Sequence, residues 1–229
     1  MNEAGNIEGS VNYFQKFKLP QSFTILDIGT HFGSFVAELD KLGYCNSQGI
    51  DLDKVSISKG IERYPYLSHR LKYYDGLNLP YQSGYFDIIT MFDVIEHIPN
   101  IVTFLHSEVL RVLKNGGFLI FQTPNLLTNV PWEVIQHKSL TGWRQYHCSL
   151  QTFWSLRNIL QNAGFTDINI ERFDLLSEYN HERIRHTFGR LRPLILSLVK
   201  LNSILPIGAI TNFWGICQKP NIVFQVDKG

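Results

Sequence analysis

Short apolar runs alternate with longer segments of helical period along the first half of the chain. The runs are rich in β-branched and aromatic residues, which is typical of buried strands. They lie at 23–28, 48–52, 69–74, 86–92 and 118–122. The run at 86–92 is apolar on both faces, as expected of a central strand in a parallel sheet.

Segments with apolar residues at helical spacing separate these runs. They lie at 34–42, 54–63 and 101–113, and Gly43 follows the first of them as a C-terminal cap. Strand alternating with helix indicates βαβ units with right-handed crossovers. With two further strands expected at 166–173 and 213–226, we predict an α/β fold. It is a doubly wound, seven-stranded, mostly parallel sheet with a helical cap and insertion.

The second half of the chain is less regular. Segment 125–149 has no clear period and is rich in Trp, His and Gln, which predicts a loop or cap, and a helix is expected at 150–162. We assign 126–150 as a cap over the acceptor side and 177–212 as a helical insertion. No internal repeat or low-complexity linker is present, so 1–229 is interpreted as a single domain.

Composition narrows the class of protein further. The chain has 229 residues, of which 44% are hydrophobic and 18% charged, with a net charge of +1. That balance is ordinary for a globular domain and exerts no overall attraction on nucleic acid or a membrane surface. The three cysteines lack metal or disulfide spacing, and neither a secretory signal nor a membrane-spanning run is visible. We therefore expect a soluble, cytoplasmic protein.

The turn after the first predicted strand carries two glycines, Gly29 and Gly33, behind an acidic residue, Asp27. Ligands of open α/β sheets bind at the carboxyl ends of the strands, where glycine lets the backbone approach them closely. His31 occupies the place of the middle glycine of the dinucleotide fingerprint, and the last spacing is one residue short. The turn thus disfavours a nicotinamide dehydrogenase, while a purely structural βα turn remains open.

Acidic residues also follow the next two predicted strands. Asp51 ends the second, where a carboxylate can accept hydrogen bonds from ribose hydroxyls. Asp75 and Gly76 end the third, where a carboxylate can accept from an adenine amino group. Asp is common at strand ends, but its recurrence on three successive strands favours a nucleotide-containing ligand.

These features together resemble the class I S-adenosylmethionine-dependent methyltransferases. The resemblance extends over roughly residues 23–173, and its specificity lies in the combination of motifs. The motifs are Leu26-Asp-Ile-Gly29 with Gly33, Gly49-Ile-Asp51, Asp75-Gly-Leu-Asn-Leu-Pro80, Phe86-Asp87, Val94-Ile-Glu-His97 and Leu110-Arg-Val-Leu-Lys-Asn-Gly-Gly117.

The resemblance implies that S-adenosylmethionine is the cofactor and assigns a role to each matching residue. The methionyl part would lie on the turn, the ribose on Asp51, the adenine against Leu52 and at Asp75–Gly76, and Phe92 or Asp93 on the other side. The turn residues are Asp27, Gly29, Thr30, His31 and Gly33. His31 departs from the family, which usually has glycine there, so it is expected to affect the shape of the methionine pocket.

Two histidines are candidates for the catalytic base. His97 follows the fourth strand and His147 lies in the aromatic cap segment, and an imidazole with a pKa of about 6.5 suits a base near neutral pH. His97 can instead be read as a helix-start packing residue. The pair favours a small-molecule acceptor with a hydroxyl oxygen. A small amine, a metal-assisted RNA-type 2′-O-methyl transfer and a non-catalytic cofactor-binding module remain alternatives.

A divalent metal ion is a further alternative, which we do not favour. Asp93, Glu96, His97 and His147 resemble the acid-x-x-Glu-His arrangement of small-RNA 2′-O-methyltransferases and ubiquinone-pathway O-methyltransferases. Carboxylate oxygens with imidazole would suit Mg²⁺, Mn²⁺ or Zn²⁺. Because Asp93 can equally contact the cofactor, we predict no metal site.

The insertion carries four arginines before an apolar stretch. The arginines are Arg183, Arg185, Arg190 and Arg192. We interpret them as a solvated basic face, with the apolar stripe on the core or on a second copy. A lid over the acceptor and a peripheral membrane contact through 183–201 are the alternatives. No nucleic-acid partner is expected because the net charge is near zero, and the chain is expected to be a monomer or a homodimer.

Overall fold

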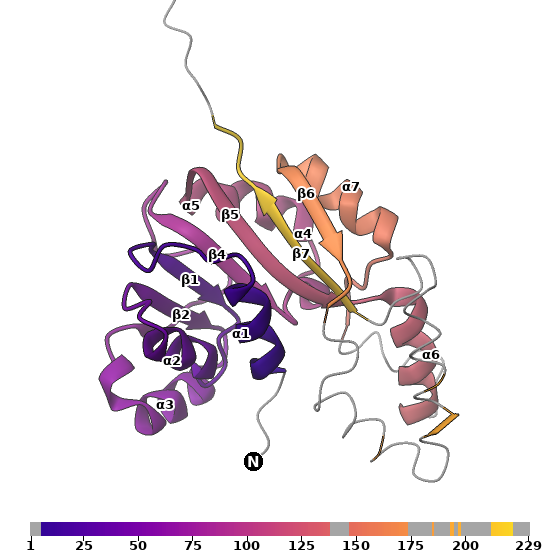
Figure 1. Cartoon of the computed structure of the whole chain (residues 1–229), viewed down its shortest axis with the longest axis horizontal. Helices are drawn as coiled ribbons and strands as arrows, with labels where there is room; N and C mark the ends of the chain where they lie inside the picture. The colour runs from indigo at the N-terminus through magenta and orange to yellow at the C-terminus, as the bar shows by residue number, and fades with distance from the viewer. Residues whose placement is uncertain are drawn as a thin grey trace, which may run out of the picture.

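A seven-stranded sheet forms the centre of the molecule in the order β3-β2-β1-β4-β5-β7-β6 (Figure 1). In the computed structural model, residues 6–137, 147–173 and 212–221 are described, together with residues 185, 193, 194 and 197. Strands β1 to β5 are mutually parallel, and β7 runs antiparallel to its neighbours β5 and β6. The predicted doubly wound, mostly parallel α/β fold is confirmed.

The sheet elements agree closely with the apolar runs. The strands are β1 Ile25–Ile28, β2 Ser47–Asp51, β3 Leu71–Tyr73, β4 Phe86–Phe92, β5 Leu113–Pro124, β6 Thr166–Glu171 and β7 Asn212–Gln218. The helices are α1 Ile7–Gln15, α2 Ser34–Lys41, α3 Lys54–Arg63, α4 Ile101–Phe104, α5 Leu110–Val112, α6 Leu126–His137 and α7 Phe153–Ala163. A π-helical turn, Leu105–Val109, joins α4 to α5.

Helices cover both faces of the sheet because its central strands are apolar on both sides. Ile25 of β1 packs into a cluster with α1 and α2, whereas the next residue, Leu26, packs into a cluster with the α4–α5 helical segment and α7. Side chains on a strand alternate between faces, so one strand supplies both clusters. From β1 the chain adds β2 and β3 on one side of the sheet and then returns to add β4 and β5 on the other side. The change of side between β1 and β4 creates the switch point where ligands of such folds bind.

Helix α1 was not predicted from the sequence. Its first turn is capped by Asn6, whose side-chain oxygen accepts a hydrogen bond from the Gly9 N–H at 2.9 Å. Tyr13 and Phe14 are fully buried against α2 and the sheet. The polar start of the chain concealed this helix, although an Asn cap before apolar residues is a helix-start signal.

The prediction that residues 125–149 form a loop is wrong for residues 126–137, which form α6. Asn125 initiates this helix: its side-chain oxygen accepts from the Leu127 N–H at 3.1 Å, and its carbonyl accepts from the Asn129 N–H at 2.8 Å. Helix α6 follows directly from β5 (Figure 1). Pro131 and the mixed composition of the segment obscured the helical period.

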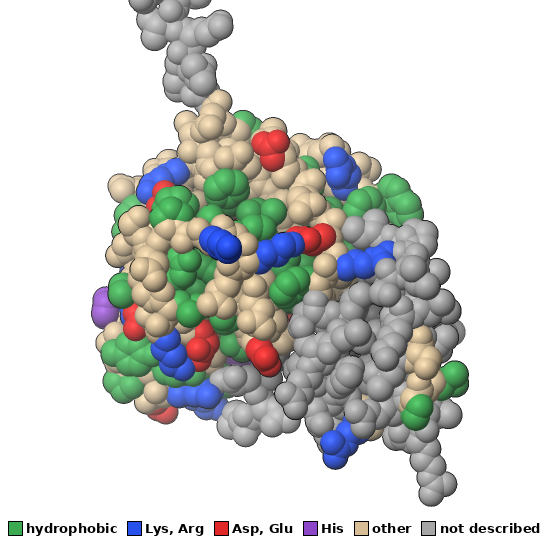
Figure 2. All heavy atoms as spheres, viewed as in Figure 1, with side chains coloured by type: hydrophobic (Ala, Val, Ile, Leu, Met, Phe, Trp, Pro, Cys, Tyr) green, Lys and Arg blue, Asp and Glu red, His purple; other side chains and the backbone are tan. Residues whose placement is uncertain are grey.

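Residues 138–146 of the cap segment and most of the predicted insertion 177–212, including Arg183, Arg190 and Arg192, lie outside the described residues. No helix within the described ranges is long and apolar enough to cross a bilayer. On the face shown in Figure 2, basic and acidic side chains are interspersed among apolar ones. Among the described side chains on that face, charges of one sign do not gather into a region of the kind that attracts a polyanion.

Candidate functional site

A cavity of about 370 Å³ opens at the carboxyl ends of β1, β2 and β4, at the switch point of the sheet. Its volume falls in the range of small-molecule pockets. Nine of the residues predicted from the sequence line it. They are Asp27, Gly29, Thr30, His31, Asp51, Leu52, Phe92, Asp93 and His97.

Four predicted residues lie outside the lining of this cavity. A Cβ atom on Gly33 would meet the Leu71 side chain at 2.6 Å, so this glycine serves the packing of the turn against β3. Asp75 is exposed, and its Oδ1 accepts a hydrogen bond from the Leu77 N–H at 2.9 Å. Gly76 and His147 are also beside the cavity and not in its wall.

The turn between β1 and α2 brings backbone to the cavity surface. Gly29 has φ +79°, and a Cβ there would lie 2.4 Å from Val94 Cγ2, so a side chain is excluded at this position. His31 also has a left-handed backbone, with φ +51°. Glycine adopts that conformation without strain, which is the physical reason a glycine is favoured there. The His31 N–H donates to Asp51 Oδ2 at 2.7 Å, and this bond helps to hold the unusual conformation.

Asp27 forms the buried acidic end of the cavity. It is only 4% exposed, and Thr90 Oγ1 donates a hydrogen bond to its Oδ1 at 2.7 Å. Burial raises the pKa of Asp27 to about 7, against the opposing effect of the Thr90 hydroxyl. A cationic ligand group would stabilise the carboxylate of Asp27, because its positive charge compensates for the solvation that burial removes.

A second carboxylate and three apolar side chains also line the cavity. Asp51 Oδ1 accepts from the Asp53 N–H at 2.8 Å, which orients the carboxylate at the end of β2. Leu52 and Tyr74, from the β2–β3 side of the sheet, and Phe92, at the end of β4, present apolar surface to the cavity. A carboxylate next to apolar walls suits a ligand that combines hydroxyl groups with a flat base.

Helix α1 contributes to the site, which the sequence analysis missed. Asn6, Ile7 and Ser10 line the cavity, placed there by the packing of Tyr13 and Phe14 into the core. The signal that could have revealed them is the Asn6 cap followed by apolar residues at helical spacing. Asn6, Ile7 and Ser10 therefore close one side of the pocket.

Glu96, His97 and His147 come together beside the cavity. The rings of His97 and His147 have centroids 5.1 Å apart, and His97 Nε2 lies 3.9 Å from Glu96 Oε1. The Ser149 N–H donates to the Glu96 carbonyl at 2.8 Å, which brings segment 147–149 against the end of β4. The structure therefore unites three of the four residues in the alternative metal set, across about 50 residues of chain.

Glu96 is the buried member of this cluster, with 1% exposure. Thr123 Oγ1 donates to its Oε2 at 2.9 Å. Burial raises the pKa of Glu96, and the neighbouring carboxylate of Asp93 raises it further. One donor atom from each of Glu96, His97 and His147 lies within 4.8 Å of the others, so the set fits a divalent cation as well as a proton-transfer pair.

Comparison with known proteins identifies the family of the chain. A family model described as a methyltransferase domain matches residues 7–170. This range runs from the start of α1 to the penultimate residue of β6, and it includes every residue of the cavity wall named above except Asn6.

Curated relatives match about half of the chain. Human EEF1A lysine methyltransferase 2 is 34% identical over 125 residues, which are 50% of this chain and 53% of the relative. The mitochondrial ubiquinone biosynthesis O-methyltransferase of Candida albicans is 33% identical over 111 residues, 45% of this chain and 33% of the relative. The chain thus spans about half the length, or less, of these relatives.

Solved structures share the fold over nearly the whole chain. Haemonchus contortus phosphoethanolamine N-methyltransferase 2, in complex with S-adenosyl-L-methionine, superposes with a TM-score of 0.65 at 19% identity. The match covers 93% of this chain and 52% of that structure. At this identity the likeness establishes the fold alone.

Proposed function

The chain belongs to the class I S-adenosylmethionine-dependent methyltransferase family, and from this premise we propose that it methylates a hydroxyl oxygen of a small molecule. The observation that carries the proposal is the pair of imidazoles, His97 and His147, at one side of the cofactor cavity. A hydroxyl oxygen is a weak nucleophile until a base takes its proton, whereas the nitrogen of a neutral amine is nucleophilic enough to attack a methyl group without such a base. The named relatives act on lysine nitrogen and on oxygen, so the acceptor atom has to be inferred from the site itself.

The residues of the cavity fit the cofactor. Asp27 is buried and gains stability from a positive charge, which the amino group of the methionyl moiety would supply. Asp51 would accept from the ribose hydroxyls, and Leu52 and Tyr74 would pack against the base. Gly29 lets the chain pass close to the methionyl moiety because no side chain intervenes.

S-adenosylmethionine supplies a methyl group on a cationic sulfur. In the proposed reaction the acceptor oxygen bonds to the methyl carbon as the carbon–sulfur bond breaks. The electron pair of the broken carbon–sulfur bond stays on sulfur. His97 or His147 takes the hydroxyl proton, so the products are a methyl ether and S-adenosylhomocysteine. The site contributes mainly by holding the acceptor in line with the methyl group, since position accounts for much of the acceleration in such displacements.

A turnover assay tests the proposal directly. The full chain is incubated with S-adenosylmethionine and a panel of sugars, phenols and amines, and S-adenosylhomocysteine release is measured. We expect release with at least one hydroxyl compound and a methyl ether as the product. Turnover with amines alone would contradict the oxygen assignment. Absence of cofactor binding at millimolar concentration, measured by isothermal titration, would overturn the enzyme assignment as a whole.

A metal-assisted form of the same reaction is the second candidate, favoured by the grouping of Glu96, His97 and His147. A divalent ion held by these three residues would bind the acceptor oxygen and lower the pKa of its hydroxyl. In that case the two imidazoles serve as ligands, and no free imidazole is needed as the base. Loss of turnover on chelation, restored by one divalent ion, would support this form, while turnover that is indifferent to a chelator would exclude it.

We also propose a cytoplasmic location. Cys45 and Cys148 are exposed free thiols and Cys217 is a buried one, which fits a reducing compartment. Cell fractionation tests this location. Recovery of the protein in a secreted or membrane fraction would contradict it.

A further inference from the structure

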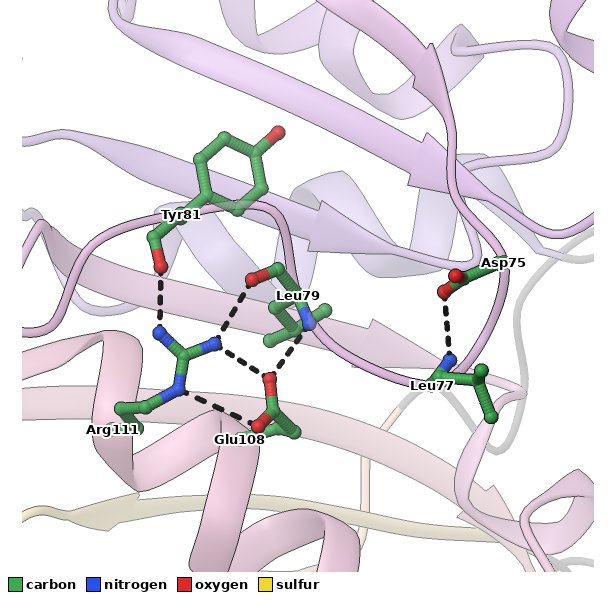
Figure 3. A network of polar contacts seen from close by, with 6 residues as sticks. All are labelled: Asp75, Leu77, Leu79, Tyr81, Glu108 and Arg111. Carbon is green, nitrogen blue, oxygen red and sulfur yellow. Dashed lines mark hydrogen bonds and ion pairs between the residues drawn. The ribbon is translucent and has the colours of Figure 1, made fainter.

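Two side chains from one helical segment hold the loop that follows β3. The loop runs through Asp75, Leu79 and Tyr81 before β4 begins (Figure 3). Glu108 lies in the π-helical turn and Arg111 in α5, three residues further on. Both side chains point from the helix toward the loop (Figure 3).

Arg111 and Glu108 bind the backbone of the loop at three points. Arg111 Nη1 donates to the Tyr81 carbonyl at 2.6 Å, and Nη2 donates to the Leu79 carbonyl at 2.9 Å. Glu108 Oε2 accepts from the Leu79 N–H at 2.7 Å. The two side chains also pair with each other, with Arg111 Nη2 2.6 Å from Glu108 Oε2. The planar guanidinium suits this task because its donors are fixed in one plane.

The π-helical turn Leu105–Val109 adjoins this contact. Glu108 lies within it and is almost buried at 9% exposure, so an unpaired carboxylate there would be costly. π-helical turns occur preferentially at functional sites. Here the turn presents a buried acid to a loop backbone that has no regular secondary structure of its own.

The pinned segment is short and follows Tyr74, which lines the cavity. Leu79 is 2% exposed and anchored in the core, and Asp75 is tied to Leu77 by the hydrogen bond from the Leu77 N–H. Gly76 lies against Leu52 of the cavity wall, since a Cβ on Gly76 would be 2.9 Å from Leu52 Cδ2. Only residues 76–78 separate the anchor at Leu79 from Asp75.

Tyr74 connects the two regions electrostatically. It lines the cavity, and burial raises its pKa to about 12. The carboxylates of Asp51, Asp75 and Glu108 contribute to the same rise, which places Tyr74 within the field of all three. The carboxylates of Asp51, Asp75 and Glu108 therefore all lie near this one buried side chain.

We propose that Glu108 and Arg111 are positioning residues, which fix Asp75 at the edge of the cofactor base and so make the site selective for adenine. The proposal rests on the proposed function, because it requires the cofactor to bind in this cavity. Asp75 can accept a hydrogen bond from the amino group of adenine but not from the carbonyl of a 6-oxo purine. The ratio of the affinities for these two bases therefore reports the position of Asp75. A change in fold stability alone would leave this ratio unchanged.

The experiment compares S-adenosylhomocysteine with S-inosylhomocysteine, which carries the 6-oxo base, by isothermal titration. For the unmodified chain we expect S-adenosylhomocysteine to bind about tenfold more tightly. In Arg111→Gln we expect the two affinities to become nearly equal. Arg111→Lys should give an intermediate ratio of affinities. An ammonium group keeps the positive charge but lacks the fixed, planar donors with which Arg111 binds the Leu79 and Tyr81 carbonyls. Arg111→Lys also serves as the test if the glutamine variant does not fold.

Arg70→Gln is the matched control. Arg70 also joins a carboxylate, Asp40, to a backbone carbonyl, that of Cys45, but it does so at the opposite end of β3. It should lower thermal stability without changing the affinity ratio. In an Asp75→Asn background, Arg111→Gln should produce no further change in the ratio, because the group it positions has already been altered.

The outcomes separate the two proposals. If the unmodified chain binds S-adenosylhomocysteine with base selectivity and Arg111→Gln or Arg111→Lys retains the full ratio, Glu108 and Arg111 are only structural and this assignment is overturned. If the unmodified chain binds both compounds equally, the assignment is likewise overturned while the cofactor site stands. Failure to bind S-adenosylhomocysteine at all would overturn the proposed function itself.

Discussion

The hydroxyl of Thr90 donates a hydrogen bond to Asp27 Oδ1 at 2.7 Å, between facing positions of β4 and β1. Both side chains are buried, so this neutral donor offers Asp27 a partner without offering it a compensating charge. Burial therefore prevails and raises the pKa of Asp27 to about 7. A buried acid that titrates near neutrality connects the affinity for a cationic cofactor to pH.

We expect cofactor affinity to fall as the pH is lowered through about 7, because protonated Asp27 no longer attracts the amino group of the cofactor. Well below the midpoint the association constant should fall by about tenfold per pH unit. Isothermal titration with S-adenosylhomocysteine from pH 5.5 to 7.5 measures this change. Thr90→Val removes the donor and should move the midpoint upward. An affinity independent of pH would show that Asp27 does not meet the cationic group.

The same acid should limit stability in the absence of cofactor. The folded pKa of about 7 exceeds the ordinary value of 3.8, so the fold favours the protonated form. Stability associated with Asp27 is therefore greatest at low pH and is lost as pH rises from about 4 to 7. Asp27→Asn is neutral throughout, so its advantage over the unmodified chain should grow across this window to about 2–4 kcal/mol. Urea denaturation at pH 5 and pH 8 measures it, and an equal difference at both pH values would contradict the prediction.

Gly29→Ala should abolish cofactor binding and destabilise the fold by about 2–4 kcal/mol. The new Cβ would lie 2.4 Å from Val94 Cγ2, on a backbone with φ +79°. Gly84→Ala is the matched control, since Gly84 has φ +66° but no atom within 4 Å of the added Cβ. That variant should cost only about 1 kcal/mol and leave affinity unchanged. Equal losses in the two variants would mean that backbone conformation, and not the contact with Val94, excludes a side chain at Gly29.

If one imidazole is the general base, either His97→Ala or His147→Ala should lower kcat by about 10²- to 10⁴-fold. If both imidazoles are ligands of a required ion, each variant should lose activity to a similar extent. Affinity for S-adenosylhomocysteine should change by less than about twofold, since neither imidazole is assigned to the cofactor. His69→Ala, at an exposed position, is the control for loss of an imidazole and should leave both quantities unchanged. If kcat is unaltered in both His97→Ala and His147→Ala, neither histidine takes part in the reaction.

Local sequence pattern was sufficient for the central sheet and for helices such as α3, although not for α1 and α6. The apolar run at 86–92 coincides with β4 Phe86–Phe92, and the periodic segment at 54–63 coincides with α3 Lys54–Arg63. Asp27 and Asp51 could be placed at strand ends because the carboxyl ends of parallel strands share one edge of the sheet. Hydrophobic periodicity and backbone preference act over a few residues, so both are readable in the chain itself.

Contacts between distant residues were decided only by the tertiary structure. Whether a glycine faces ligand or core is one example: Gly29 borders the cavity, while Gly33 packs on Leu71. The closing of the pocket by α1 and the meeting of His147 with Glu96 are two more. Each depends on how connecting segments fold back onto the sheet, and that follows from the packing of the whole core. The sequence by itself thus determined the sheet, the glycine turn and the acids at the ends of β1 and β2, and the assembled core determined which side chains surround the pocket.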